Sequence, residues 1–177
     1  GHEVTFYPGY TNLILAYIVI ISKEEFADVE NIIKVKDNIK KTNPTASIVD
    51  ASLHITVENL EIIKGRKVLA VEDGPTVTHG GMTYGAAVMA ARKYGSSILV
   101  DPRPFAVGSI KETFKKYPGI DNLLPAMGYG RKQIRELEET INRTDCDAVI
   151  IGTPIDLGKI IKINKPIVRA KYELQEI

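Results

Sequence analysis

Residues 66–100, RKVLAVEDGPTVTHGGMTYGAAVMAARKYGSSILV, decide the fold of this chain. Their pattern predicts a strand over residues 67–71, a helix over residues 81–94 that Gly95 ends, and a second strand over residues 97–100. A helix between two apolar strands is typical of parallel pairing, because the helix returns the chain to the edge at which the first strand began.

The same alternation continues on both sides of this segment. Before it, the pattern predicts strands over residues 16–21 and 46–49, a helix from about residue 26 that Asn43 and Pro44 end, and a short helical piece over residues 60–63. After it, helices are expected over residues 109–117, 131–142 and 154–161, and strands over residues 123–124, 148–151 and 167–171. These units predict an α/β fold with a mostly parallel, doubly wound sheet, Rossmann-like or P-loop-like, and helices on both faces.

The composition excludes several classes of protein. The chain has 177 residues, 44% apolar and 25% charged, as in a globular protein, and its formal charge of +1 creates no field that would attract nucleic acid or an anionic membrane. The longest apolar run, residues 13–21, has about half the length of a membrane span. The single cysteine, Cys146, excludes an internal disulfide and a cysteine-built zinc site, and it fits a cytoplasmic protein.

The segments that follow the strands are the candidate sites, because a doubly wound sheet binds ligands beyond the carboxyl ends of its strands. The first is residues 72–81, EDGPTVTHGG, in which Glu72 and Asp73 are candidate ligands for Mg²⁺. Backbone N–H groups and hydroxyls of this loop are suited to a phosphate, and we assign that role to Gly74, Thr76, Thr78, Gly80 and Gly81. The alternative is that the glycines only let the next helix pack closely on the sheet.

Three later segments offer further candidates. Arg103 lies between two prolines, which fix the backbone around a guanidinium suited to a phosphate or a carboxylate. The alternative is an ion pair with Asp101 in an ordinary turn. The other candidates stand near expected helix starts, where N–H groups bind phosphate or are simply capped: Ser109, Gly128, Gly130 and Thr153.

Residues 22–25, SKEE, follow the first expected strand and partly match the Asn-Lys-x-Asp element with which P-loop GTPases read the guanine base. Ser22, Lys23 and Glu25 are therefore candidates for nucleotide binding, although a charged first turn of a helix would look the same. Residues 50–52 end the next expected strand, where a GTPase places its second base-contacting loop. The sequence contains no Gly-x-x-x-x-Gly-Lys-Ser/Thr, so we do not expect the chain alone to bind a nucleoside triphosphate well.

Six ordered motifs resemble one known family. They are VEDGPT at residues 71–76, THGGM at 78–82, DPRP at 101–104, LPAMGYG at 124–130, GTPIDL at 152–157 and VRAKYEL at 168–174. Together they look like the C-terminal part of the cyclic 2,3-diphosphoglycerate synthetase family, whose members are also labelled predicted GTPases and come from archaea and some thermophilic bacteria. The resemblance covers essentially the whole chain, and it favours a fragment of a longer protein.

The resemblance implies an enzyme that uses ATP and Mg²⁺ to close 2,3-diphosphoglycerate into a cyclic phosphoanhydride. It implies a phosphate-binding loop upstream of Gly1, so the missing N-terminal portion of the same protein is an expected partner. Residues 1–62 would then be the closing β-α-β part of a P-loop nucleotide-binding domain, and residues 63–177 a Rossmann-like C-terminal domain. Because this substrate is highly anionic, we assign catalysis to Arg103 and His79.

One departure from the family leaves the nucleotide open. Ser22 and Glu25 occupy the first and last positions of the base-reading element, where the family is closer to Asn-Lys-x-Asp, so guanine recognition is weakened and ATP is easier to accept. Two other functions stay open: a GTPase-like nucleotide hydrolase, and a non-catalytic module that binds a phosphorylated ligand. We expect no nucleic-acid or membrane partner, and a homo-oligomer stays possible.

Overall fold

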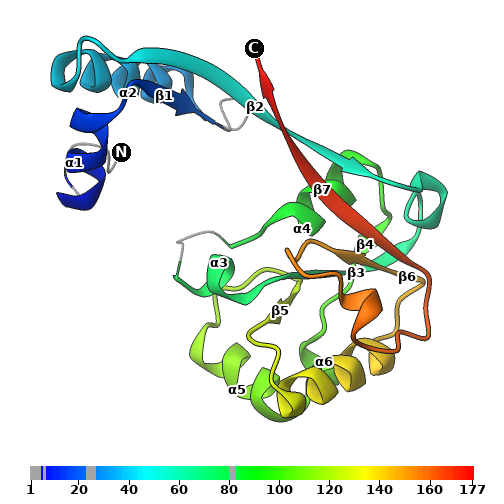
Figure 1. The fold of residues 1–177 in the computed structure, drawn as a ribbon. Coiled ribbons are helices and arrows are strands. Elements are labelled where there is room, and N and C mark those ends of the chain that lie inside the picture. Colours follow the sequence, from blue (N-terminus) through cyan, green and yellow to red (C-terminus); the bar gives the residue numbers. More distant parts are fainter. Residues whose placement is uncertain (1–4, 6, 23–26, 80–82) are drawn as a thin grey trace. The chain divides into compact units, whose positions relative to one another are not determined.

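The computed structural model describes residue 5 and residues 7–22, 27–79 and 83–177 (Figure 1). The helices are α1 (Tyr7–Leu15), α2 (Val29–Thr42), α3 (Gly74–His79), α4 (Ala86–Lys93), α5 (Gly108–Lys116) and α6 (Arg131–Arg143). The strands are β1 (Ile18–Ile21), β2 (Ser47–Val57), β3 (Lys67–Asp73), β4 (Ile98–Leu99), β5 (Leu124–Ala126), β6 (Ala148–Ile151) and β7 (Ile167–Glu176). Among the described residues, these elements are joined by the 3₁₀ helices η2 (Leu60–Ile62), η3 (Arg103–Phe105) and η4 (Leu157–Lys159).

The chain divides into two compact units. Unit 1 comprises residues 1–54 and 173–177, and unit 2 comprises residues 55–172. β2 and β7 each run from one unit into the other. The domain identities expected from the sequence, a P-loop part followed by a Rossmann-like part, stay predictions.

The sheet of unit 2 is parallel and is built around β3. β6 pairs along one edge of β3, with Val71 opposite Ile151. β4 and β5 share the other edge, β4 at the start of β3 and β5 at its end, and β7 lies beyond β6. Every pairing among these strands is parallel, which confirms the α/β fold with a mostly parallel sheet.

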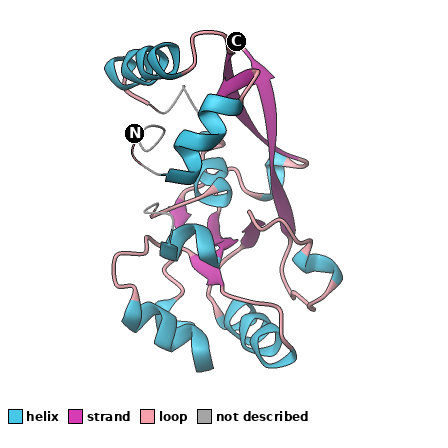
Figure 2. Ribbon diagram, turned by 60° about the vertical axis from the view of Figure 1, so that its left-hand side comes forward, coloured by secondary structure: helices cyan, strands magenta, loops and turns pink. Residues whose placement is uncertain are grey.

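Helices cover both faces of this sheet. Figures 1 and 2 show α4 on one face, and α5 and α6 on the other. Residues 68–71 of β3 and 148–151 of β6 have no exposed surface, as expected of strands covered on both sides. Ala87, Ala90 and Ala91 of α4 are also fully buried, because side chains this small let the helix lie close to the strands.

The order of connections places a topological switch point between β3 and β6. The chain leaves β3 over one face and reaches β4 through α3 and α4. It then passes over the other face through α5 to β5, on the same edge of β3 as β4, and through α6 to β6 on the opposite edge of β3. In open parallel sheets, ligands bind where the connections diverge, beyond the carboxyl ends of the two strands.

Several elements differ from those expected. Residues 74–79, expected as an open loop, form α3, and the next helix begins at Ala86 rather than at residue 81 because Gly85 is its N-cap. The strand expected over residues 46–49 continues to Val57, so residues 50–52 lie inside β2 and not in a loop. Instead of a helix over residues 154–161, the structure has only η4, and α1 was not expected at all.

Unit 1 contains α1, β1, α2 and most of β2. β1 and β2 are parallel, with Ile21 opposite Asp50, and the N–H of Ile177 donates to the carbonyl of Asp50 on the other edge of β2. Asn43, at the end of α2, is buried and donates its amide to the carbonyls of Leu13, Ile14 and Ala16 at the end of α1. In the described part of the chain, no helix has both the length and the hydropathy needed to cross a membrane.

Candidate functional site

The carboxyl ends of β3, β5 and β6 form the candidate site. Asp73 ends β3 opposite Ala126 of β5, and Ile151 of β6 lies opposite Val71 of β3. The segments that follow these strands therefore start side by side at the switch point. Two of the motifs quoted above, LPAMGYG and GTPIDL, supply the segments after β5 and β6, and the chain enters α3 directly after Asp73.

Glu72 points into the protein, under the start of α4. It is 2% exposed, and its Oε1 accepts hydrogen bonds from the N–H groups of Gly85 (3.1 Å) and Val88 (2.9 Å). Burial raises the pKa of Glu72 to about 7, while the hydrogen bonds from the backbone act against that shift. This carboxyl group thus holds the N-terminus of α4, and its assignment to Mg²⁺ stays a prediction.

Two glycines leave room for the Glu72 carboxyl group. A Cβ atom at Gly85 would lie 2.6 Å from its Oε2, and one at Gly152 would lie 2.5 Å from the same oxygen. Gly152 follows β6, and its N–H donates to the carbonyl of Val71. These glycines are therefore required by close packing across the switch point, which for Gly85 is the alternative that the sequence left open.

The hydroxyls assigned to phosphate in the first segment bond within the chain. The Thr76 hydroxyl lies 3.2 Å from Oδ2 of Asp73 and donates to it, and the Thr78 hydroxyl donates to the carbonyl of Gly74 at 2.8 Å. Gly74 itself lies against β5, since a Cβ there would be 2.7 Å from the carbonyl oxygen of Ala126. Residues 74–79 are helical, so this part of the segment is not the loop that the sequence suggested, whereas Gly80 and Gly81 lie outside the described residues.

Arg103 is held by four groups of the protein. Its Nη1 lies 2.9 Å from Oδ1 of Asp101 and 3.4 Å from Oδ1 of Asn122, and its Nη2 donates to the carbonyl of Ile120. The guanidinium also lies 5.2 Å from the ring centre of Phe114. This is the ion pair in a turn that the sequence left as the alternative, and the catalytic role of Arg103 stays a prediction.

Ser109 binds a carboxylate of the protein itself. Its N–H donates to Oε2 of Glu136 at 3.0 Å, and its hydroxyl donates to the same oxygen. Gly108, with φ at +51°, takes the left-handed conformation that brings the start of α5 to this carboxylate. These hydrogen bonds lower the pKa of Glu136, which occupies the position that the sequence offered to a phosphate.

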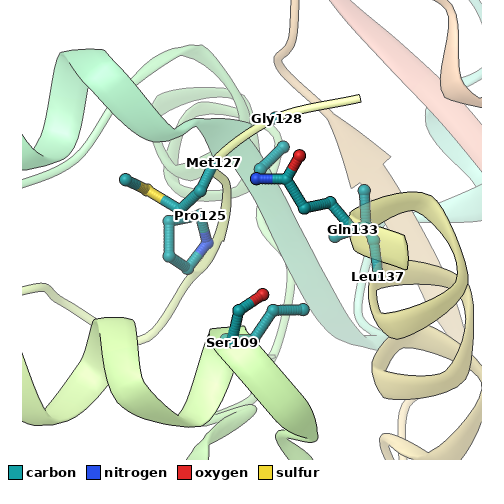
Figure 3. A pocket seen from close by; sticks show the side chains of 8 residues that line it. Ser109, Pro125, Met127, Gly128, Gln133 and Leu137 are labelled. Atoms are coloured by element: carbon teal, nitrogen blue, oxygen red, sulfur yellow. The ribbon is translucent and has the colours of Figure 1, made fainter. Parts of the chain in front are cut away.

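A small pocket lies between the start of α5, β5 and α6. Ser109, Pro125, Met127, Gly128, Gln133 and Leu137 are among the residues that line it (Figure 3). Gln133 points toward Gly128, and its Oε1 accepts a hydrogen bond from the N–H of Gly130 at 3.2 Å. The free volume is about 10 Å³, room for about one water molecule, so this pocket as it stands does not hold a substrate.

Tyr129 and Thr153 come together at the carboxyl edge. Thr153 is 4% exposed, and its hydroxyl donates to the carbonyl of Ile155 at 2.7 Å. The Tyr129 hydroxyl is buried, and this burial is the main cause that raises its pKa. The negative charge of Asp73 raises the pKa further, whereas a hydrogen bond with the Thr153 side chain lowers it. Sequence reasoning chose Thr153 but missed Tyr129, although the tyrosine stands between Gly128 and Gly130, both of which were chosen.

The remaining candidates are only partly described. Ser22 follows β1 and is exposed, in unit 1, whereas Lys23, Glu25, Gly80 and Gly81 lie outside the described residues. The backbone of His79 ends α3. Among the described residues, no three His, Cys, Asp or Glu side chains gather as a metal-binding group.

Two comparisons bear on the function. No protein-family model matches the chain. The chain is 57% identical over all of its 177 residues to a protein from Thermococcus kodakarensis named arginine synthetase ArcE. It spans 40% of the length of that relative. The sequence motifs predicted similarity to a synthetase, and this relative is named one. They did not predict a synthetase named after arginine.

Proposed function

We propose that the intact protein is a nucleotide-dependent synthetase that forms arginine. The observation that carries this proposal is the 57% identity to a protein named arginine synthetase, which extends over the whole chain and so includes every segment at the carboxyl edge of the sheet. Because the chain spans 40% of that relative, the activity is proposed for the intact protein and not for these residues alone.

The charges at the carboxyl edge favour a nitrogen-containing substrate over a phosphorylated one. Arg103 pairs with Asp101, and Ser109 binds Glu136, so these two of the groups expected to meet a phosphorylated substrate are engaged by carboxylates of this chain. Asp73 adds a further negative charge where β3 ends. Carboxylates repel a polyphosphate and attract a guanidinium, with which they form charge-assisted hydrogen bonds.

ATP and Mg²⁺ remain part of this proposal. ATP would supply the group that turns an oxygen atom of the substrate into a leaving group. The residues of this chain do not fit the triphosphate, since the sequence contains no Gly-x-x-x-x-Gly-Lys-Ser/Thr, and we propose that another part of a longer polypeptide binds it. We derive no step at the nucleotide from the residues of this chain.

Closure of 2,3-diphosphoglycerate into its cyclic form is the second candidate function. The six ordered motifs of the sequence favour it. It requires Arg103, His79 and the helix starts to meet a highly anionic substrate, so Arg103 and Ser109 would first have to leave the carboxylates that hold them. A GTPase-like hydrolase or a module that binds a phosphorylated ligand would form neither arginine nor cyclic diphosphoglycerate.

A product assay on the intact protein separates these functions. Arginine differs from citrulline by one nitrogen in place of the ureido oxygen, so its formation from citrulline and ammonia requires activation and loss of that oxygen. The protein is incubated with ATP and Mg²⁺ and either citrulline plus ammonium or 2,3-diphosphoglycerate, and products are detected by mass spectrometry. We expect arginine in the first reaction and no cyclic diphosphoglycerate in the second.

Other results would contradict this proposal and support another function. Cyclic diphosphoglycerate without arginine would establish the second candidate function. Nucleotide hydrolysis that depends on neither substrate would favour the GTPase-like hydrolase. Omission of ATP from the first reaction is the control, and it should abolish arginine formation.

A further inference from the structure

β1 has the sequence of a strand from the interior of a parallel sheet. Its four residues, IVII, are a continuous apolar run, which is typical of strands that are covered on both faces. β6, with the similar sequence AVII, has no exposed surface at any of its four residues. In β1, by contrast, Ile18 and Ile20 are 61% and 52% exposed. The described residues therefore leave β1 without the cover that its sequence predicts.

α2 covers one face of β1, and the other face is exposed. Ile21 lies opposite Asp50 of β2, and the Asp50 carboxylate pairs with Lys36 of α2 at 2.6 Å, so α2 lies on the face that Ile21 and Asp50 share. Because side chains alternate along a strand, Ile18 and Ile20 point to the opposite face. The burial of β1 alternates in the same way, with the two residues on the α2 side half-buried.

The outer edge of β1 is unpaired in the described part of the chain. β1 stands at one end of the strand order, with β2 on its inner edge. The N–H of Ser47 in β2 donates to the carbonyl of Tyr17 at 2.9 Å, so residues 17, 19 and 21 direct their backbone groups toward β2. Ile18 and Ile20 direct theirs to the outer edge, where no described strand lies.

We propose that the outer edge of β1 and the face formed by Ile18 and Ile20 are the docking surface for another segment of the same longer polypeptide. This chain spans 40% of its relative, so more than half of that polypeptide has no counterpart in these residues. The proposal rests on the length of the relative and on the exposure of β1, and it does not depend on the reaction proposed above.

A parallel strand with its connecting helix fits this surface. The strand would pair with the free backbone groups of Ile18 and Ile20, as β2 does on the inner edge. A parallel strand is joined to its neighbour through a crossover of a dozen or more residues, usually a helix that lies on a face of the sheet. Such a helix would cover the exposed side chains of Ile18 and Ile20, so one strand–helix unit meets both requirements.

A second copy of the chain fits this surface less well. Two β1 strands related by a two-fold axis would pair in antiparallel orientation, and that pairing would bring no helix over Ile18 and Ile20. A segment of the same polypeptide also acts at an effective concentration of roughly millimolar, which a second copy in dilute solution does not reach. We therefore assign the surface to the same polypeptide.

Hydrogen exchange of the wild-type intact protein and of the 177-residue chain tests the edge. Exchange is measured at single-residue resolution by mass spectrometry at low protein concentration. We expect the Ile18 and Ile20 amides to exchange at least roughly tenfold more slowly in the intact protein, because the added strand gives them hydrogen bonds. The Val19 and Ile21 amides, which face β2, are the internal controls and should be protected in both proteins.

Thiol labelling tests the exposed face. Ile20→Cys is made in both proteins in a background without other cysteines, and its reaction with a maleimide is timed. We expect labelling at least roughly tenfold slower in the intact protein, because a covered thiol reacts only after local opening. Glu112→Cys, at an exposed position of α5 in unit 2, is the control and should react at the same rate in both proteins.

Each other outcome would overturn the proposal. Equal exchange of the Ile18 and Ile20 amides in the two proteins, fast in both, would mean that the surface stays open. Slow exchange in both would place the covering segment within the 177 residues. Protection of the intact protein that is lost on dilution, together with sedimentation as a dimer, would assign the surface to a second copy. None of these measurements depends on arginine formation, so the docking surface and the proposed function can fail separately.

Discussion

Glu72 makes the stability of the fold depend on pH in the opposite direction from an ordinary surface carboxylate. Its pKa is about 7 in the folded protein, above the usual value of 4.5, so the folded state keeps a proton that the unfolded state has lost. Stability is therefore greatest below pH 4.5 as far as this group is concerned, and it falls as the pH rises to about 7. A shift of this size corresponds to about 3 kcal/mol.

We expect Glu72→Gln to remove this dependence. The glutamine oxygen can still accept from the N–H groups of Gly85 and Val88, but the side chain no longer titrates. The measurement is the free energy of unfolding in urea at pH 5 and pH 8, where the wild-type protein should lose stability and the variant should not. Glu112→Gln, an exposed change in α5, serves as the control, and an equal loss in Glu72→Gln would contradict the raised pKa.

Gly152 is a second residue whose role is set by Glu72. A Cβ there would lie 2.5 Å from Oε2 of Glu72 and 2.8 Å from the backbone nitrogen of Ala87, and backbone cannot move aside as a flexible side chain can. We expect Gly152→Ala to destabilise the protein by about 1–3 kcal/mol through overpacking. Gly119→Ala, which would meet no atom within 4 Å, should cost much less by the same urea measurement.

At the level of single residues, the sequence predicted the place of the site but not the direction of its side chains. Glu72 and Asp73 are adjacent acids at the end of a strand that is buried on both faces, so no alternation of polar and apolar residues shows which of them turns inward. Ser109 was predicted to bind phosphate because it stands near the start of a helix. Its actual partner, Glu136, is distant in the sequence and could not be recognised from it. Such pairings depend on tertiary contacts, which local pattern does not contain.

At the scale of elements, Asn43 joins the two helices of unit 1. Its buried amide donates to three carbonyls at the end of α1, at 2.9, 3.2 and 2.8 Å. We expect Asn43→Ala to destabilise unit 1 by about 1–3 kcal/mol, because buried acceptors lose their donor. Hydrogen exchange of the amides in α1 measures this directly.

The control for this prediction is Asn31→Ala. Asn31 is an exposed asparagine in the same helix, α2, and its side chain contacts only Asp28 at 3.5 Å in the contacts described. Exchange in α1 should stay at the wild-type rate in Asn31→Ala. Equal protection of α1 in both variants would mean that Asn43 does not hold the two helices together.

The elements that were predicted well are those with a strong local signal. β6 was expected over residues 148–151, and α6 was expected to begin at residue 131, as both do, because one is a continuous apolar run and the other has apolar residues at helical spacing. α1 was missed because its sequence, YPGYTNLIL, contains proline and glycine near its start. β2 was ended too early because Asp50, a turn-forming residue type, lies inside the strand.

At the scale of the whole molecule, unit 1 exposes several large apolar side chains. Leu15, Tyr17, Ile18 and Val29 are 72%, 91%, 61% and 70% exposed. β1 stands at one end of the strand order, so one of its edges has no described strand beside it. Apolar edge strands of this kind promote association between chains.

We therefore expect the 177-residue chain to self-associate with increasing concentration. Ile18→Lys together with Ile20→Lys should reduce this association, because charges on an edge strand oppose pairing with another strand. Analytical ultracentrifugation of both proteins is the measurement, and Ile155→Lys, in the segment after β6, is the control. A chain that stays monomeric at every concentration would contradict this prediction.

The division of the chain also determines the order in which its units are completed during synthesis. Residues 173–177 belong to unit 1, although they are made after all of unit 2, and Ile177 bonds to β2. At roughly 5–20 residues per second, β2 waits several seconds on the ribosome for this neighbour. All residues of unit 2 are synthesised before the last residues of unit 1. The parallel sheet with the candidate site is therefore free to fold while unit 1 is still incomplete.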